Sequence, residues 1–114
     1  MTIPEDGVLL RIFIGESDRH DGAPLYEAIV RAARAASLAG ATVLRGPMGF
    51  GARSRLHTAK ILRLSEDLPV VIEIVDSEPK IDAFLPTLDG MVREGLVTLE
   101  RVRVLKYRAD PPAE

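Results

Sequence analysis

The sequence predicts one α+β domain of the ferredoxin-like kind, in which a four-stranded antiparallel sheet carries two helices on one face. Apolar residues alternate with period two in four segments and recur with the helical period in two others. The segments follow one another in the order β-α-β-β-α-β. With right-handed crossovers, that order produces the split βαβ arrangement.

The composition is that of one globular domain over residues 1–114, with 46% hydrophobic and 28% charged residues. A formal net charge of −2 gives no general attraction to nucleic acid, and we expect none as a partner. The lack of cysteine excludes disulfides and a thiol nucleophile. Neither an apolar run of about 18 residues nor a signal peptide is visible, so we expect a cytoplasmic protein that is not membrane-embedded.

The first half of the chain predicts a strand, a helix and a second strand. "GVLLRIFIG" (7–15) alternates between two faces, which hold Leu10, Ile12 and Ile14 on one side and Leu9, Arg11 and Phe13 on the other. "PLYEAIVRAARAASLAG" (24–40) predicts a helix with Pro24 early, an i,i+4 pair of Glu27 with Arg31, and a stop at Gly40. "ATVLRG" (41–46) predicts the second strand.

The second half predicts a strand in "LPVVIEIVD" (68–76) and a helix over 78–94 with Ser77 as N-cap. Pro86 predicts a kink or weakened turn in that helix, and Gly95 its end. "LVTLERVRVLKY" (96–107) predicts the last strand, and we expect the core to span 8–108 and the tail 109–114 to be disordered. Because apolar parity changes within the last strand, we expect either a bulge near Glu100 or two buried faces.

The sheet face without helices is too apolar to remain in water. It would hold Leu9, Phe13, Val71 and Val75. We therefore expect a homo-oligomer in which this face is covered.

The segment of about 46–67 is rich in glycine and cations. From Arg45 to Arg63 it has no carboxylate, and its five basic residues are Arg45, Arg53, Arg55, Lys60 and Arg63. Glycines Gly46, Gly49 and Gly51 would let backbone amides approach an anion, which predicts phosphate or nucleotide binding. The alternative is a solvated hairpin loop. Phe50 is a local anchor or a base-stacking platform, and residues 56–64 predict a short helix in which His57 binds phosphate or is polar surface.

Two further clusters have two interpretations each. "GESDRHD" (15–21) has the composition of a metal site around His20, or is a polar turn. Arg101 and Arg103 lie on one strand face and either bind an anion or form salt bridges with Glu73 or Glu100. No nucleophile motif, metal motif or acid–base pair is present in the sequence, so we expect no enzyme.

Several segments closely resemble the uncharacterised family of PII-like (GlnB-like) proteins, relatives of the PII nitrogen-regulatory signalling proteins. The resemblance covers residues 8–108 and rests on "LLRIFIGE", "LAGATVLRGPMGFG", "LPVVIE" and "GLVTLERVRVLKY". It implies a homotrimer and a long T-loop between the second and third strands. In PII signalling proteins, adenine nucleotides or 2-oxoglutarate bind in clefts between subunits.

By position, the resemblance implies a ligand site at the T-loop base, at the loop before the last strand, and on the last strand. Its residues would be Gly46, Met48, Gly49, Phe50, Gly51, Arg53, Gly95, Leu96, Arg101 and Arg103. Arg55, His57 and Lys60 would contact a protein partner. The loop "VREGLVT" lacks the phosphate-binding lysine of PII proteins, and the T-loop lacks their modified tyrosine. ATP specificity and a 2-oxoglutarate response therefore do not carry over.

The resulting hypothesis is a non-enzymatic trimeric sensor. It would bind ATP, ADP or AMP between subunits and regulate a partner protein through the T-loop. The partner is unknown, and a membrane channel or transporter is one candidate. One alternative is a small enzyme that acts on a phosphate-containing substrate with Arg53, His57 and Arg101. Another is a structural or RNA-contacting oligomer.

Overall fold

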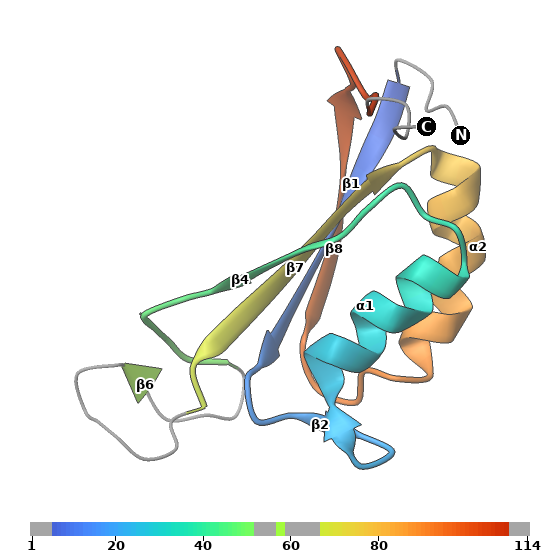
Figure 1. Cartoon of the computed structure of the whole chain (residues 1–114). Coiled ribbons are helices and arrows are strands. Elements are labelled where there is room, and N and C mark those ends of the chain that lie inside the picture. Colours follow the sequence, from blue (N-terminus) through green and yellow to red (C-terminus); the bar gives the residue numbers. More distant parts are fainter. Residues whose placement is uncertain (1–5, 52–56, 59–66, 110–114) are drawn as a thin grey trace, which may run out of the picture.

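The computed structural model describes residues 6–51, 57–58 and 67–109. Its elements are β1 (Asp6–Gly15), β2 (Arg19–His20), β3 (Ala23–Pro24), α1 (Leu25–Ala35), β4 (Thr42–Arg45), β5 (Met48–Gly49), β6 (His57–Thr58), β7 (Pro69–Asp76), α2 (Glu78–Asp89) and β8 (Leu96–Arg103). The main sheet is antiparallel with the order β4-β7-β1-β8, and both helices lie on one face of it (Figure 1). The predicted ferredoxin-like fold is therefore confirmed.

The core lies between the helices and the two central strands. Leu10, Ile12 and Ile14 are buried there, as the alternation in β1 predicts. They meet Ile29 of α1 and Leu88 of α2, both of which are almost fully buried. The helices cover mainly β1 and β7. On the same face of the sheet, Val97 and Leu99 of the edge strand β8 remain 40% and 46% exposed.

Both helices end earlier than predicted. Helix α1 ends at Ala35, and Ser37, not Gly40, takes the left-handed conformation, with φ of 62°. Helix α2 continues one turn beyond Pro86 but ends at Asp89 rather than at residue 94. Ser77 occupies the N-cap position as predicted, although its side chain donates or accepts no capping hydrogen bond.

Strand β8 contains no bulge. Its residues pair one to one with β1 from Leu96 opposite Phe13 to Arg103 opposite Asp6. The predicted bulge near Glu100 is therefore wrong. Val97 and Leu99 face the helix side, whereas Val102 lies on the open side of the sheet, so both faces of this edge strand carry apolar residues.

A short hairpin lies between β1 and α1, in and just after the segment 15–21 for which a metal site or a polar turn was expected. β2 and β3 pair through a two-residue turn at Asp21 and Gly22, whose φ values are 50° and 82°. Two consecutive positive φ values are typical of the tight turn that Asp-Gly favours. The hairpin places Asp18 and Arg19 beside the start of α1.

The buried carboxylate of Asp76 joins three elements at the end of β7. Asp76 is fully buried, and its Oδ2 accepts a hydrogen bond from the Ala39 amide at 2.9 Å. Its Oδ1 accepts one from the Ser77 amide at 2.7 Å, and Lys80 Nζ lies 3.9 Å from Oδ2. The connection between α1 and β4 is thereby held against the start of α2.

Candidate functional site

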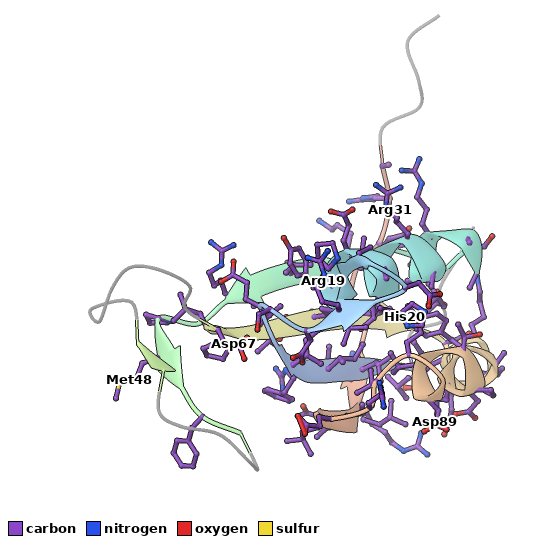
Figure 2. The ribbon with its side chains drawn as sticks, turned by 90° about the horizontal axis from the view of Figure 1, so that it is seen from below. Arg19, His20, Arg31, Met48, Asp67 and Asp89 are labelled. Carbon is purple, nitrogen blue, oxygen red and sulfur yellow. The ribbon has the colours of Figure 1, made fainter. Side chains whose placement is uncertain are left out.

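The base of the loop between β4 and β7 is packed against Pro69. The Gly46 amide donates to the Pro69 carbonyl at 2.8 Å. A Cβ at Gly46 or at Gly49 would lie 3.0 Å from Cγ of the same proline. These two glycines are therefore needed for close packing inside the chain, which is a role that the anion-binding hypothesis did not consider. Figure 2 shows Met48 of β5 at the end of the molecule away from the helices.

The loop starts as a hairpin rather than a helix. Gly49 of β5 pairs with His57 of β6, so the short helix predicted over 56–64 is wrong at residues 57 and 58. Met48 and Phe50 are 56% and 74% exposed, so Phe50 is not a buried anchor. The candidate residues Arg53, Arg55 and Lys60 lie outside the described residues, as does Arg63.

Arg45 at the loop base is held by a carboxylate from the end of β1. Its Nη2 lies 2.6 Å from Oε2 of Glu16. The Glu16 amide in turn donates to the Leu68 carbonyl, and the Ser17 amide donates to Oδ1 of Asp67 at 2.8 Å. Figure 2 shows Asp67 just before β7 begins. The first turn after β1 and the loop base therefore form one hydrogen-bonded unit.

The predicted ligand residues fall at two ends of the sheet. Leu96 pairs with Phe13 at the end of β1 that also adjoins the loop base. Arg101 and Arg103 lie near the other end of β8, because Arg103 is paired with Asp6. At about 3.3 Å per residue, Leu96 and Arg103 are roughly 23 Å apart along the strand. One subunit therefore does not bring the loop base together with these arginines.

The predicted partners of the two arginines are also wrong. Glu73 and Glu100 both bind Arg11, at 2.9 Å and 3.2 Å, on the open face of the sheet. The hydrogen bond with Glu73 raises the pKa of Arg11 above its ordinary value, so the guanidinium stays charged. Arg101 instead lies 3.5 Å from Glu78 at the start of α2, on the helix side.

The open face has a cleft of about 370 Å³ at the Arg103 end of the sheet. Leu9 and Val75 form its apolar floor, and residues 39–42 form one wall. The chain beyond β8 forms the other wall, with Val104, Lys106 and Tyr107, and the Tyr107 hydroxyl donates to the Ala39 carbonyl at 2.9 Å. Sequence reasoning missed Lys106 and Tyr107 because it placed them in a continuing strand.

The acidic cluster after β1 is divided among separate partners. Glu16 binds Arg45, Oδ2 of Asp18 accepts from the Gly15 amide, and Nε2 of His20 lies 3.4 Å from Asp21. Within residues 6–51, 57–58 and 67–109, no three His, Asp or Glu side chains are grouped as metal ligands would be. The described helices also include none that is long and apolar enough to span a bilayer.

Comparison with known proteins gives two kinds of match. The family model DUF190, described as "Uncharacterized ACR, COG1993", matches residues 7–104. A UPF0166 protein of Aquifex aeolicus is 41% identical over 97 residues, covering 85% of this chain and 91% of that protein. A UPF0166 protein of Methanocaldococcus jannaschii is 35% identical over 99 residues, covering 86% and 91%.

Solved structures match at low identity. CPII, a nitrogen regulatory PII-like protein from Thiomonas intermedia K12 bound to ADP, AMP and bicarbonate, is 16% identical with a TM-score of 0.60, covering 89% of this chain and 90% of that chain. The GlnK–ATP complex of B. subtilis is 11% identical with a TM-score of 0.56, covering 89% and 85%. These likenesses show a shared fold.

Proposed function

Because this chain belongs to the DUF190 family and has the fold of PII-like proteins, we propose that it is a non-enzymatic regulatory protein of the cytoplasm that binds an adenine nucleotide. The nucleotide would bind at a boundary between subunits of a homotrimer. Binding would change the conformation of the T-loop, residues 46–67, and thereby regulate a partner protein. Support comes from the ADP, AMP and ATP bound to the structural neighbours and from the cleft on the open face.

The cleft is the observation that carries the proposal. Its volume of about 370 Å³ lies at the lower end of the range for ligand pockets. A planar base would rest on Leu9 and Val75, while backbone groups of residues 40–42 would bind its polar edge. Lys106 lines the same cleft and would neutralise a phosphate. Arg101 and Arg103 project from the helix side of the adjacent edge strand, so they would contact phosphates only where these extend round the edge of β8, together with the loop base of a neighbouring subunit.

Nucleotide titrations by calorimetry test this site. We expect at least one of ATP, ADP and AMP to bind, without being consumed during the titration. Lys106→Ala is expected to weaken binding by about tenfold or more, because a charge-assisted hydrogen bond to phosphate is lost. The double variant Arg101→Ala/Arg103→Ala is expected to weaken binding less, because both side chains lie on the helix side of the sheet and do not line the cleft.

Arg31→Ala serves as the matched control, since Arg31 is an exposed arginine on α1 that does not line the cleft. Its affinity should equal that of the unaltered protein. If no adenine nucleotide binds, the proposed ligand is wrong. Unchanged affinity in Lys106→Ala would reject the cleft as its site.

The open sheet face is the proposed trimer interface. An apolar row runs across all four strands, formed by Leu44, Val71, Phe13 and Leu96 in register. Phe13, near its centre, is 36% exposed, and Leu44 and Leu96 are 48% and 56% exposed. A row of this kind is normally covered by another chain.

Phe13→Glu is therefore expected to convert the trimer into monomers, because a carboxylate would be buried against an apolar surface. Light scattering after size-exclusion chromatography measures the mass directly. Ala35→Glu is the control, because Ala35 is exposed at the end of α1 on the opposite side of the molecule, and it should remain trimeric. A monomeric unaltered protein would contradict this assignment.

A further inference from the structure

A second cavity, of about 410 Å³, lies between two connections that are distant in sequence. Asp18, Arg19 and Leu25 come from the segment that joins β1 to α1. Met91, Arg93 and Glu94 come from the segment that joins α2 to β8. The cavity shares no lining residue with the cleft proposed for the nucleotide. It therefore requires a separate explanation.

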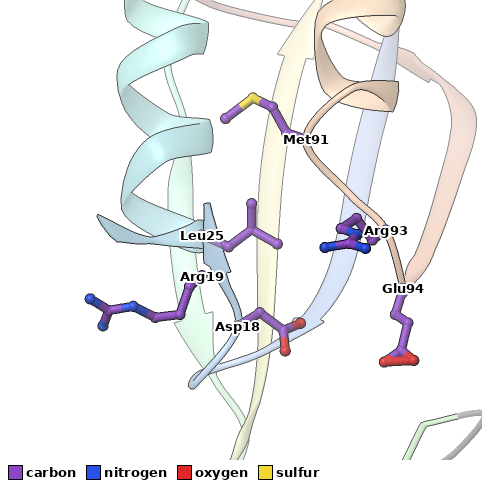
Figure 3. A pocket seen from close by; sticks show the side chains of 6 residues that line it. All are labelled: Asp18, Arg19, Leu25, Met91, Arg93 and Glu94. Carbon is purple, nitrogen blue, oxygen red and sulfur yellow. The ribbon is translucent and has the colours of Figure 1, made fainter. Parts of the chain in front are cut away.

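Two opposite charges face this cavity without neutralising each other. Figure 3 shows the Asp18 carboxylate and the Arg93 guanidinium directed into the same space, whereas Arg19 and Glu94 point away from it. Arg19 is already engaged, since its Nη2 donates to the Gly22 carbonyl at 2.6 Å. Among the described residues, Arg93 makes no hydrogen bond or ion pair. One oxygen of Asp18, Oδ2, accepts from the Gly15 amide, and Oδ1 has no hydrogen-bond donor in the described part of the chain.

The inner wall of the cavity is apolar. Leu25 and Met91 line it and are 3% and 9% exposed, respectively. A ligand that fits must therefore present one anion, one cation and a hydrocarbon group. An arginine binds a carboxylate through two parallel hydrogen bonds, and a carboxylate oxygen accepts from an ammonium group.

We infer that this cavity binds a small α-amino acid with an apolar side chain. The ligand carboxylate would bind Arg93, its ammonium group would bind Oδ1 of Asp18, and its side chain would contact Leu25 and Met91. The volume is ample for such a molecule, which would leave room for ordered water. The inference does not rest on the proposed nucleotide site.

The position of Asp18 connects this cavity to the base of the T-loop. Asp18 holds the Gly15 amide, and Gly15 lies against Asp67, whose Oδ1 accepts from Ser17. The intervening Glu16 holds Arg45 at the loop base. A ligand that fixes Asp18 would therefore stabilise one arrangement of the turn from which the loop base is held.

Calorimetry with L-leucine, L-methionine and L-valine tests the inference on the full chain. We expect saturable binding with Kd below ~1 mM for at least one of them. Two analogues of leucine, 4-methylpentanoate and isopentylamine, each lack one charged group and should bind at least about tenfold more weakly. Analogues that bind as tightly as leucine would overturn the zwitterion assignment, and so would the absence of saturable binding up to ~10 mM.

Two variants locate the site. Arg93→Ala and Asp18→Asn should each weaken leucine binding by about tenfold, whereas Arg31→Ala should leave it unchanged. Asp18→Asn keeps an acceptor for the Gly15 amide, and Arg93 loses no contact with a partner among the described residues, so both variants should fold, as thermal unfolding will verify. If both variants bound leucine as tightly as the unaltered protein, the assignment of leucine to this cavity would be wrong.

Amide chemical shifts give a readout that does not depend on nucleotide binding. Leucine should move the NMR signals of Gly15, Ser17 and Glu94 and leave that of Asp82 on α2 in place. If leucine shifted only the signals of residues elsewhere in the protein, its binding site would lie outside this cavity and the inference would be wrong. Because the nucleotide titrations use different variants, either proposal can fail while the other holds.

Discussion

Replacing Asp76 by alanine is expected to lower the free energy of unfolding by about 2–4 kcal/mol, because two hydrogen bonds to a buried carboxylate are lost. Asp76 is fully buried and accepts from the amides of Ala39 and Ser77. Alanine leaves both amides without this acceptor and removes the charge that faces Lys80. Asp76→Asn, which keeps one acceptor oxygen, should lose roughly half as much.

Urea unfolding at a fixed protein concentration measures this change, since any oligomer makes stability depend on concentration. Asp82→Ala is the matched control, because Asp82 is an exposed aspartate on α2. It should change stability by less than ~0.5 kcal/mol. If Asp76→Ala were as stable as the control, the carboxylate would not be what holds the α1–β4 connection to α2.

Gly95→Ala is expected to cost about 2–4 kcal/mol, through backbone strain and a clash together. Gly95 has a φ of 150°, which a residue with a Cβ rarely adopts. A Cβ there would lie 2.7 Å from the Phe13 carbonyl oxygen, a backbone atom that cannot move without disturbing β1. The register of Leu96 opposite Phe13 depends on this close approach.

Gly40→Ala provides the comparison for Gly95→Ala in the same unfolding experiment. No atom of the described residues lies within 4 Å of the Cβ that it would add, so its effect should be within ~0.5 kcal/mol of zero. A loss of under ~1 kcal/mol in Gly95→Ala would show that the connection before β8 adjusts freely, contrary to the packing seen here.

The fold was predictable because each main element has its own clear signal. Alternation in β1 and β7 identified the buried face, and the order of elements determined the topology. The ends of the helices were less predictable, since several residues are able to stop a helix. The sequence offered Gly40, but the chain turns at Ser37, where Leu38 becomes buried and Ala39 reaches Asp76.

Strand β8 shows that the alternation of apolar residues does not by itself determine how a strand pairs with its neighbour. The change in apolar parity was compatible with a bulge or with two covered faces, and the strand keeps its register and carries apolar residues on both faces. Strand β8 lies at the edge of the sheet, beyond the two strands that the helices cover. Its residues on the helix side, Val97 and Leu99, therefore remain partly exposed. The alternative of two faces to be covered was the one consistent with this register.

The candidate site was predictable only in part, because its side chains come from segments that the sequence keeps apart. Glu73 and Glu100 were expected to pair with Arg101 and Arg103 if these did not bind an anion, but the register of β7, β1 and β8 brings both glutamates to Arg11. Asp18 and Arg93 line one cavity only because the segment that joins β1 to α1 lies next to the segment that joins α2 to β8. The Asp-Gly turn signal predicts the β2–β3 hairpin, whereas no local sequence pattern predicts which segment of the chain lies beside it.

The central position of β1 determines when the chain is able to fold. Within the described residues, β1 pairs only with β7 and β8, which begin at Pro69 and Leu96, whereas β4 pairs with β7 and not with β1. No strand pairing in the main sheet is therefore available to the first half of the chain alone. During synthesis, β1 and α1 must wait until β7 has left the ribosome, and closure of the sheet must await β8. Such long-range pairing predicts slow folding for a domain of this length.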